Sequence, residues 1–170
     1  LQASPKDMQW FRDAKLGMFI HWGPVSLKGT EIGWSRGKAR PDQRQGGKGP
    51  IPVEVYDNLY KQFNPTEFDA REWVALAKAA GMRYMVFTTK HHDGFCMFDS
   101  RLTDYKITNS PFKRDIVAEI ARACHEGGLR LGFYYSPPDW HHPDYRTENH
   151  AKYIEYLHGQ VRELCTNYGK

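Results

Sequence analysis

The chain has 170 residues, of which 40% are hydrophobic and 26% are charged, a composition ordinary for a globular protein with a core of its own. Its formal charge is only +4 and its basic residues are scattered, so we expect no nucleic-acid partner; the one basic segment, residues 36–48, is broken by glycines and is interpreted as a solvated loop. No apolar run approaches the ~20 residues needed to cross a bilayer, which argues against a membrane span.

The first third of the chain predicts one short strand and a long loop. A lead-in helix is expected over residues 8–15, and an apolar strand over residues 17–21 ends in a histidine. The sequence from there to about Pro52 is rich in glycine, proline and charge, which predicts a loop. A helix is then expected over residues 53–63, where four side chains are spaced for one apolar face, namely Val53, Tyr56, Tyr60 and Phe63.

The middle of the chain predicts a helix followed by the second strand. Asp69 with Glu72 three residues later resembles a capping box, and Gly81 supplies a left-handed stop, so a helix is expected between them. Its expected buried stripe consists of Trp73, Leu76, Ala77 and Ala80. The apolar run that follows predicts a strand over residues 84–88.

The last third predicts two helices around a third strand. The first helix is expected from Asp115 to Gly127, with a buried side made of Ile116, Val117, Ile120 and Cys124. The strand is expected over residues 129–135. The second helix, residues 149–167, is indicated by the aligned side chains of Ile154, Leu157, Val161, Leu164 and Cys165. The cysteines have no metal-ligand spacing, and we expect those on the two helices to be buried thiols.

Three strand–loop–helix units predict an α/β fold with parallel strands joined by right-handed crossovers. Two architectures fit this pattern, an eight-stranded barrel and an open doubly wound sheet. The first strand is not followed by a glycine-rich phosphate turn, which weakens the nucleotide-binding alternative. A complete barrel needs ~250 residues and eight such units. On the barrel interpretation, residues 1–170 are therefore a partial domain that ends before the fourth strand.

Imidazole and phenol side chains occur where the expected strands end. His21 ends the first strand, and His91 and His92 follow the second. In the third strand Gly132 and Tyr134 share one face, while Leu131, Phe133 and Tyr135 share the other, so we expect Tyr134 to point inward. Ligands of α/β proteins bind beyond the carboxyl ends of parallel strands. We therefore expect these four ring side chains around one pocket.

Such a pocket is polar but carries little charge. An imidazole donates at one nitrogen and accepts at the other, and a phenol does both, which matches the hydroxyl groups of a sugar. Trp34 and Trp140 could supply an apolar platform for the sugar ring. A zinc site using His21 and one of the paired histidines is the alternative; adjacent histidines on an extended segment diverge, so we expect no metal ion and no cofactor. Asp93, which precedes a glycine after a strand, is interpreted as a turn residue.

Two motifs at these strand ends resemble the α-L-fucosidases of glycoside hydrolase family 29. Residues 15–23 (Lys-Leu-Gly-Met-Phe-Ile-His-Trp-Gly) resemble the first strand of that family, and residues 89–95 (Thr-Lys-His-His-Asp-Gly-Phe) resemble the second. Residues 113–115 and 132–136 resemble the segments that follow. The similarity extends from about Met8 to the end of the chain. It implies the amino-terminal portion of a (β/α)8 TIM barrel that removes L-fucose from glycans or glycoconjugates with retention of configuration.

The resemblance also implies a set of fucose-binding residues, namely His21, Trp34, His91, His92 and Tyr134. The family often has a glutamate directly before the tryptophan; this chain has Gly33 there, and Glu31 is a candidate replacement. A secreted, periplasmic or lysosomal location is implied as well. The sequence gives no indication of the oligomeric state.

The catalytic carboxyl pair is expected outside these 170 residues. A retaining glycosidase needs two carboxyl groups about 5–5.5 Å apart. In the resembled family the nucleophile is an aspartate at the end of the fourth strand and the acid/base lies further on, so both are expected beyond residue 170 and the isolated 170 residues are expected to be inactive. The alternative function is a catalytically silent sugar-binding module on the same scaffold, which would not need the aspartate after a fourth strand.

Overall fold

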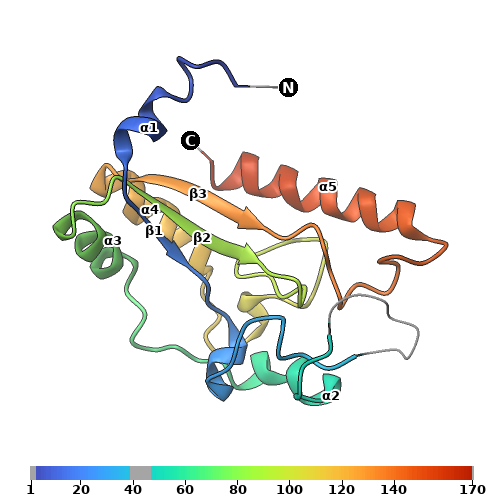
Figure 1. Ribbon diagram of the computed structural model, residues 1–170. Coiled ribbons are helices and arrows are strands. Elements are labelled where there is room, and N and C mark those ends of the chain that lie inside the picture. Colours follow the sequence, from blue (N-terminus) through green and yellow to red (C-terminus); the bar gives the residue numbers. More distant parts are fainter. Residues whose placement is uncertain (1–2, 39–46, 170) are drawn as a thin grey trace.

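The computed structural model describes residues 3–38 and 47–169. Its sheet has three parallel strands in the order β1 (Gly17–Ile20), β2 (Tyr84–Lys90) and β3 (Arg130–Tyr135). In Figure 1 the arrowheads of all three strands point toward the end of the molecule where α2 and the long loops lie. The expected α/β fold with three parallel strands is confirmed. Residues 39–46 of the basic segment lie outside the described residues.

Helices precede, connect and follow the strands. The α-helices of the described chain are α1 (Gln9–Ala14), α2 (Val53–Tyr56), α3 (Ala70–Ala79), α4 (Ile116–Gly127) and α5 (His150–Asn167). Short 3-10 helices lie in the loops, namely η1 (Pro24–Lys28), η2 (Leu59–Gln62) and η3 (Ile107–Asn109). Each strand is therefore followed by a loop at its carboxyl end and then by a helix that returns the chain.

The main core lies on one face of the sheet. Met85 and Phe87 of β2 are fully buried there together with side chains of α3 and α4, and Leu131 and Phe133 of β3 pack against them. On the opposite face, Phe19 of β1 is 55% exposed. A doubly wound sheet carries helices on both faces, whereas a barrel keeps them all on the outside. The one-sided core therefore favours the barrel over the open sheet.

The predicted start and stop of α3 are confirmed, and its predicted buried face is correct in part. The Asp69 carboxylate accepts the backbone N–H groups of Arg71 and Glu72, and Gly81 adopts a left-handed φ of 75° after the helix. Leu76, which was expected to be buried, is 63% exposed. Ala77 is buried and Trp73 packs against the core, as expected, but the helix also buries Ala70 and Val74 on the face that meets α4 and the sheet.

The single helix predicted over residues 53–63 is wrong, because the chain turns between α2 and η2. Tyr56 packs into a small cluster beneath the first loop, whereas Phe63 belongs to the main core.

Arg36 contradicts the solvated interpretation of the basic segment. Its side chain is 2% exposed, and its guanidinium contacts both carboxylate oxygens of Asp57 at 2.6 and 2.7 Å. A buried arginine keeps its charge, so it needs such a carboxylate partner. The ion pair fastens the first loop to the residue that follows α2.

The predicted apolar face of α5 is also partly wrong. Ile154, Val161 and Cys165 are exposed, whereas Tyr153, Gln160 and Leu164 are buried. Gln160 is tolerated in the interior because its amide oxygen accepts from the Tyr135 hydroxyl at 2.8 Å and its amide nitrogen donates to the Ser100 hydroxyl at 3.1 Å. The expected burial of the thiol is confirmed only for Cys124.

Candidate functional site

Three strand ends deliver one cluster of rings. His21 directly follows β1, His91 directly follows β2, and Tyr134 lies near the end of β3. The His21 ring centroid lies 5.3 Å from that of His91 and 5.3 Å from that of Tyr134, and His91 and Tyr134 are 5.8 Å apart in a stacked arrangement. The structure thus brings together side chains that are more than 40 residues apart, on the face of β3 expected for Tyr134.

His92 and two tryptophans extend this cluster. The His92 ring lies 4.2 Å from His91, 5.3 Å from Trp34 and 5.1 Å from Trp140, measured between centroids. Trp34 is 55% exposed, whereas Trp140 is buried and contacts Trp34 edge-on at 5.3 Å. Of the two tryptophans suggested by the sequence, only Trp34 therefore has a face available to a ligand; Trp140 supports it from behind.

The hydrogen bond of His92 identifies which of its nitrogens carries the proton. Nδ1 of His92 contacts the hydroxyl of Ser136, and that hydroxyl donates to the carbonyl of Pro138 at 2.9 Å. Since a serine hydroxyl has a single proton, Nδ1 must be the donor of the pair. Nε2 of His92 is then left as an acceptor.

A cavity of about 400 Å³ opens beside the rings, within the ~300–1,000 Å³ range of small-molecule sites. It is lined by His21, Val25, Ser26, Thr30, Glu31, Ile32, Trp34 and His91. Glu31 thus lies on the cavity wall, whereas the N–H of Gly33 is bonded to the Tyr56 hydroxyl at 2.7 Å. His92 and Tyr134 are not part of this wall and adjoin it through their ring contacts with His91.

Burial keeps the three imidazoles uncharged near neutral pH. It lowers the pKa of His91 to about 3, with further contributions from the neighbouring His92 and His21. The pKa values of His21 and His92 are lowered too, both mainly by burial and the latter also by the charge of Lys90. Each neutral imidazole has one donor and one acceptor nitrogen, and in His92 the donor is already bonded to Ser136, which leaves the acceptor. The cluster can therefore bind hydroxyl groups of an uncharged ligand.

Asp93 is a turn residue, as the sequence suggested, and it is also part of a buried network. Gly94 beside it has a left-handed φ of 81°. One Asp93 oxygen accepts the N–H of Phe95 at 3.2 Å, and the other accepts the Tyr56 hydroxyl at 2.7 Å. Burial raises the pKa of Asp93 to about 6, although these hydrogen bonds oppose the shift. Sequence reasoning missed Tyr56, whose position in an apolar pattern indicated only burial.

A buried ion pair lies directly beside the histidine pair. Lys90 Nζ contacts Asp139 Oδ2 at 2.8 Å, and the two side chains are 0% and 2% exposed. The other Asp139 oxygen accepts the N–H groups of His141 and His142, and the N–H of Trp140 donates to the carbonyl of His92 at 2.7 Å. The pair thus fixes the loop after β3 against the loop after β2. The sequence contained no signal for it, since lysines and aspartates are usually exposed.

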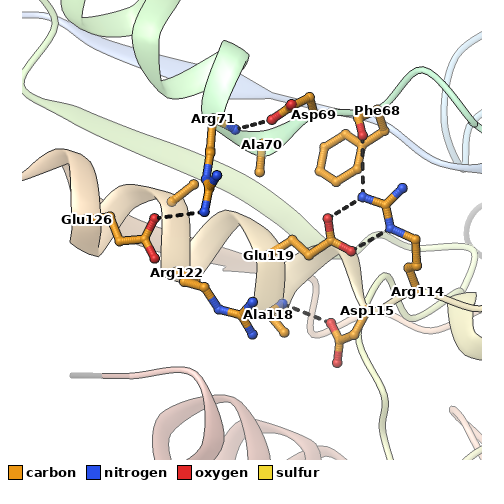
Figure 2. Close-up of a pocket in the computed structure, with 11 residues that line it drawn as sticks. Phe68, Asp69, Ala70, Arg71, Arg114, Asp115, Ala118, Glu119, Arg122 and Glu126 are labelled. Carbon is orange, nitrogen blue, oxygen red and sulfur yellow. Dashed lines mark hydrogen bonds and ion pairs between the residues drawn. The ribbon is translucent and has the colours of Figure 1, made fainter.

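A larger cavity of about 450 Å³ lies between α3 and α4 on the outer layer. Figure 2 shows that its charged side chains point toward one another: Arg114 is paired with Glu119, and Arg71 with Glu126. It contains none of the strand-end rings, and two of its three arginines are paired with glutamates of the protein itself. We therefore place the candidate site at the strand ends.

The described part of the chain has neither a metal-binding cluster nor a membrane-spanning helix. Among residues 3–38 and 47–169, no three His, Cys, Asp or Glu side chains are grouped so that they could hold a metal ion. Within the same ranges, none of the helices combines the length and the apolar character needed to cross a membrane.

Comparison with known proteins relates this chain to one family. The family described as Alpha-L-fucosidase matches residues 2–170. Alpha-L-fucosidase 1 of Arabidopsis thaliana is 36% identical over 98% of this chain and 29% of its own length. The chain thus spans less than a third of this relative.

Solved structures of similar proteins agree with the fold. Alpha-L-fucosidase isoenzyme 1 from Paenibacillus thiaminolyticus is 46% identical, with a TM-score of 0.80 over 96% of this chain and 40% of that one. A GH29 α-L-fucosidase from Bacteroides thetaiotaomicron, solved as a trapped covalent intermediate with 2-fluoro-fucosyl fluoride, is 35% identical, with a TM-score of 0.81 over 98% of this chain and 40% of that one. The three strand–helix units therefore match the amino-terminal part of the barrel in these enzymes.

Proposed function

The chain belongs to the α-L-fucosidase family, and from this membership we propose that the protein containing it hydrolyses terminal α-L-fucosyl residues of glycans or glycoconjugates with retention of configuration. The observation that carries the proposal is the cluster of neutral rings contributed by three strand ends around His21, His91 and Tyr134. Each hydroxyl of an uncharged sugar both donates and accepts a hydrogen bond, and neutral imidazole and phenol groups provide both kinds of partner.

In the proposed site, fucose hydroxyls bind to the ring side chains and one face of the sugar packs against the exposed tryptophan. The residues assigned to this role are His21, Trp34, His91, His92 and Tyr134. Glu31 supplies the carboxylate that the family often places next to the tryptophan. Its position on the cavity wall supports this assignment, as does the absence of a side chain and of room at Gly33.

Residues 1–170 are proposed to be the first part of a catalytic domain, with both catalytic carboxyl groups outside them. Retention requires a nucleophile and an acid/base about 5–5.5 Å apart and a covalent intermediate. The Bacteroides relative trapped as a covalent intermediate supports the same two-step route for this protein. A secreted, periplasmic or lysosomal location belongs to the same proposal, rests on family membership, and is tested by fractionation and immunodetection.

The decisive experiment is turnover of 4-nitrophenyl α-L-fucoside by the whole protein, with the first anomer of released fucose identified by NMR. We expect the α anomer, the product of retention. His21→Ala should raise KM by about tenfold or more through loss of a hydrogen bond to the sugar, whereas His158→Ala, at an exposed position on α5, should leave it unchanged. A first product of β configuration contradicts the retaining mechanism. Fucose binding without any turnover supports the catalytically silent module instead.

A further inference from the structure

A buried hydroxyl connects two segments of the candidate site that are far apart in the chain. Tyr56, which is 2% exposed, donates its hydroxyl proton to Asp93 Oδ2 at 2.7 Å and accepts the N–H of Gly33 at 2.7 Å. The second oxygen of Asp93 accepts the N–H of Phe95 at 3.2 Å. Both partners of the Tyr56 oxygen are thus satisfied, and every atom of the connection is removed from water.

One end of this connection lies in the cavity wall. Gly33 stands between Ile32 and Trp34, which both line the cavity, and it has a left-handed φ of 72°. A Cβ atom at Gly33 would lie 2.6 Å from Nδ1 of His91, so the loop backbone rests directly on that imidazole. The distance between this loop and the histidines therefore depends on the hydrogen bond from the Gly33 N–H to Tyr56.

The other end of the connection lies in the turn that presents the histidines. Asp93 follows His92 directly, and the N–H of Gly94 bonds to the carbonyl of His91 at 3.0 Å, which closes the turn. The Tyr56 hydroxyl thus spans from the loop that carries Glu31 and Trp34 to the turn that carries the paired histidines.

We infer that Tyr56 and Asp93 are positioning residues that hold residues 31–34 against the histidine turn, at the distance at which Trp34 and Glu31 enclose the fucose. This inference rests on the proposed function for the identity of the ligand. Neither residue lines the cavity, so both act through the loop rather than by touching the sugar. Loosening the loop removes contacts that the sugar makes equally in the bound state and in the transition state, which raises KM and leaves kcat unchanged.

The test compares two substitutions that each delete one tyrosine hydroxyl donated to a carboxylate. Tyr56→Phe breaks the connection, whereas Tyr168→Phe removes a 2.7 Å bond to Asp115 on the outer layer, away from the cavity. In the whole protein we expect Tyr56→Phe to raise KM for 4-nitrophenyl α-L-fucoside about tenfold with little change in kcat, as the loss of one hydrogen bond implies, and Tyr168→Phe to change neither.

Hydrogen exchange provides a second readout that does not depend on activity. The amides of residues 31–34 should exchange faster in Tyr56→Phe than in wild type or Tyr168→Phe, because the Gly33 amide loses its acceptor. Asp93→Asn should act in the same direction, since Tyr56 and Phe95 donate to different oxygens of Asp93 and asparagine replaces one of these two acceptors with an NH2 group. If Tyr56→Phe does not fold, the same KM and exchange measurements are made on Asp93→Asn.

The outcomes separate this inference from the proposed function. Equal KM values for Tyr56→Phe and Tyr168→Phe, or unchanged exchange at residues 31–34, overturn the positioning role. A wild-type protein that hydrolyses no α-L-fucoside overturns the proposed function, and the exchange measurement then still decides whether the connection holds the loop.

Discussion

Removing the Lys90 ammonium while keeping Asp139 should destabilise the protein strongly. The two side chains are 0% and 2% exposed and meet at 2.8 Å. In Lys90→Met the Asp139 carboxylate stays buried and keeps two backbone N–H donors, those of His141 and His142, but it has lost its countercharge. A buried charge without a partner is one of the few defects that a single substitution can create at high cost.

The expected loss in the free energy of unfolding is about 3–5 kcal/mol, toward the lower end because the two N–H bonds remain. Arg71→Met is the matched control. The Arg71–Glu126 contact is 3.6 Å long, and its side chains are 76% and 49% exposed. An exposed pair of this kind contributes only about 0–1 kcal/mol. Both substitutions replace a cation with methionine. They differ in the carboxylate that is left behind, which is buried for Asp139 and exposed for Glu126.

The pH dependence has a definite sign. Burial alone would raise the pKa of Asp139, but the charge and hydrogen bond of Lys90 outweigh it and hold that pKa below its ordinary value of 3.8. The pair therefore stabilises wild type above the ordinary carboxyl pKa, and this stabilisation is lost as pH falls through the lowered value. Without Lys90 the Asp139 pKa rises and the carboxyl takes up its proton at higher pH. The difference in the free energy of unfolding between wild type and Lys90→Met should therefore become smaller as the pH is lowered.

Urea unfolding of the whole protein, followed by tryptophan fluorescence at neutral and mildly acidic pH, measures these differences. The double variant Lys90→Met/Asp139→Asn should be more stable than Lys90→Met, because no buried charge remains. The assignment of a buried charge pair would be refuted if Lys90→Met lowered the free energy of unfolding by less than about 1 kcal/mol, or by no more than Arg71→Met does.

Three other predictions concern the rings and the cavity. Gly33→Ala should raise KM for an aryl α-L-fucoside more than Gly29→Ala, because both glycines have left-handed φ angles but a new Cβ meets His91 Nδ1 at 2.6 Å only at Gly33; equal KM values would contradict this. In an NMR titration the His91 ring should stay neutral down to about pH 4, since burial lowers its pKa to about 3. The unfolded chain binds that proton near pH 6.5, so His91 destabilises the fold as pH falls below 6.5, and a ring transition near 6.5 would contradict the assignment. Exhaustive chelation should leave turnover unchanged; a loss restored by zinc would favour the metal-dependent alternative.

The strands and the ring cluster could be predicted from sequence because their signals are local. Apolar runs and capping residues such as Asp69 mark where elements begin and end. Parallel strands bring their carboxyl ends to one edge of the sheet, and His21 and His91 meet there because β1 and β2 are neighbours. Alternation along β3 sufficed to assign Tyr134 to their side of the sheet.

The supports of the site could not be predicted, because each depends on a partner far away in the chain. Tyr56 meets Asp93 across 37 residues, and Lys90 meets Asp139 across 49. A polar residue is buried only if such a partner exists, and periodicity contains no information about partners. The same reason explains the misjudged face of α5, where the buried Gln160 replaces the apolar residues that the pattern favoured.

At the end of β2, a charged residue, Lys90, stands directly before two uncharged imidazoles, His91 and His92. Lys90 is the last residue of β2 and lies over the Tyr135 ring at 4.6 Å, next to Asp139, whereas His91 and His92 continue toward the cavity and the tryptophans. Because the Lys90 charge lowers the pKa of His92 beyond the effect of burial, the cation that anchors the loop also helps to keep this ring unprotonated. A protonated imidazole would lose its acceptor, and a sugar hydroxyl needs one for its proton. The buried ion pair therefore supports the candidate site by fixing the loop of Trp140, and its lysine helps to preserve the acceptor nitrogen of His92.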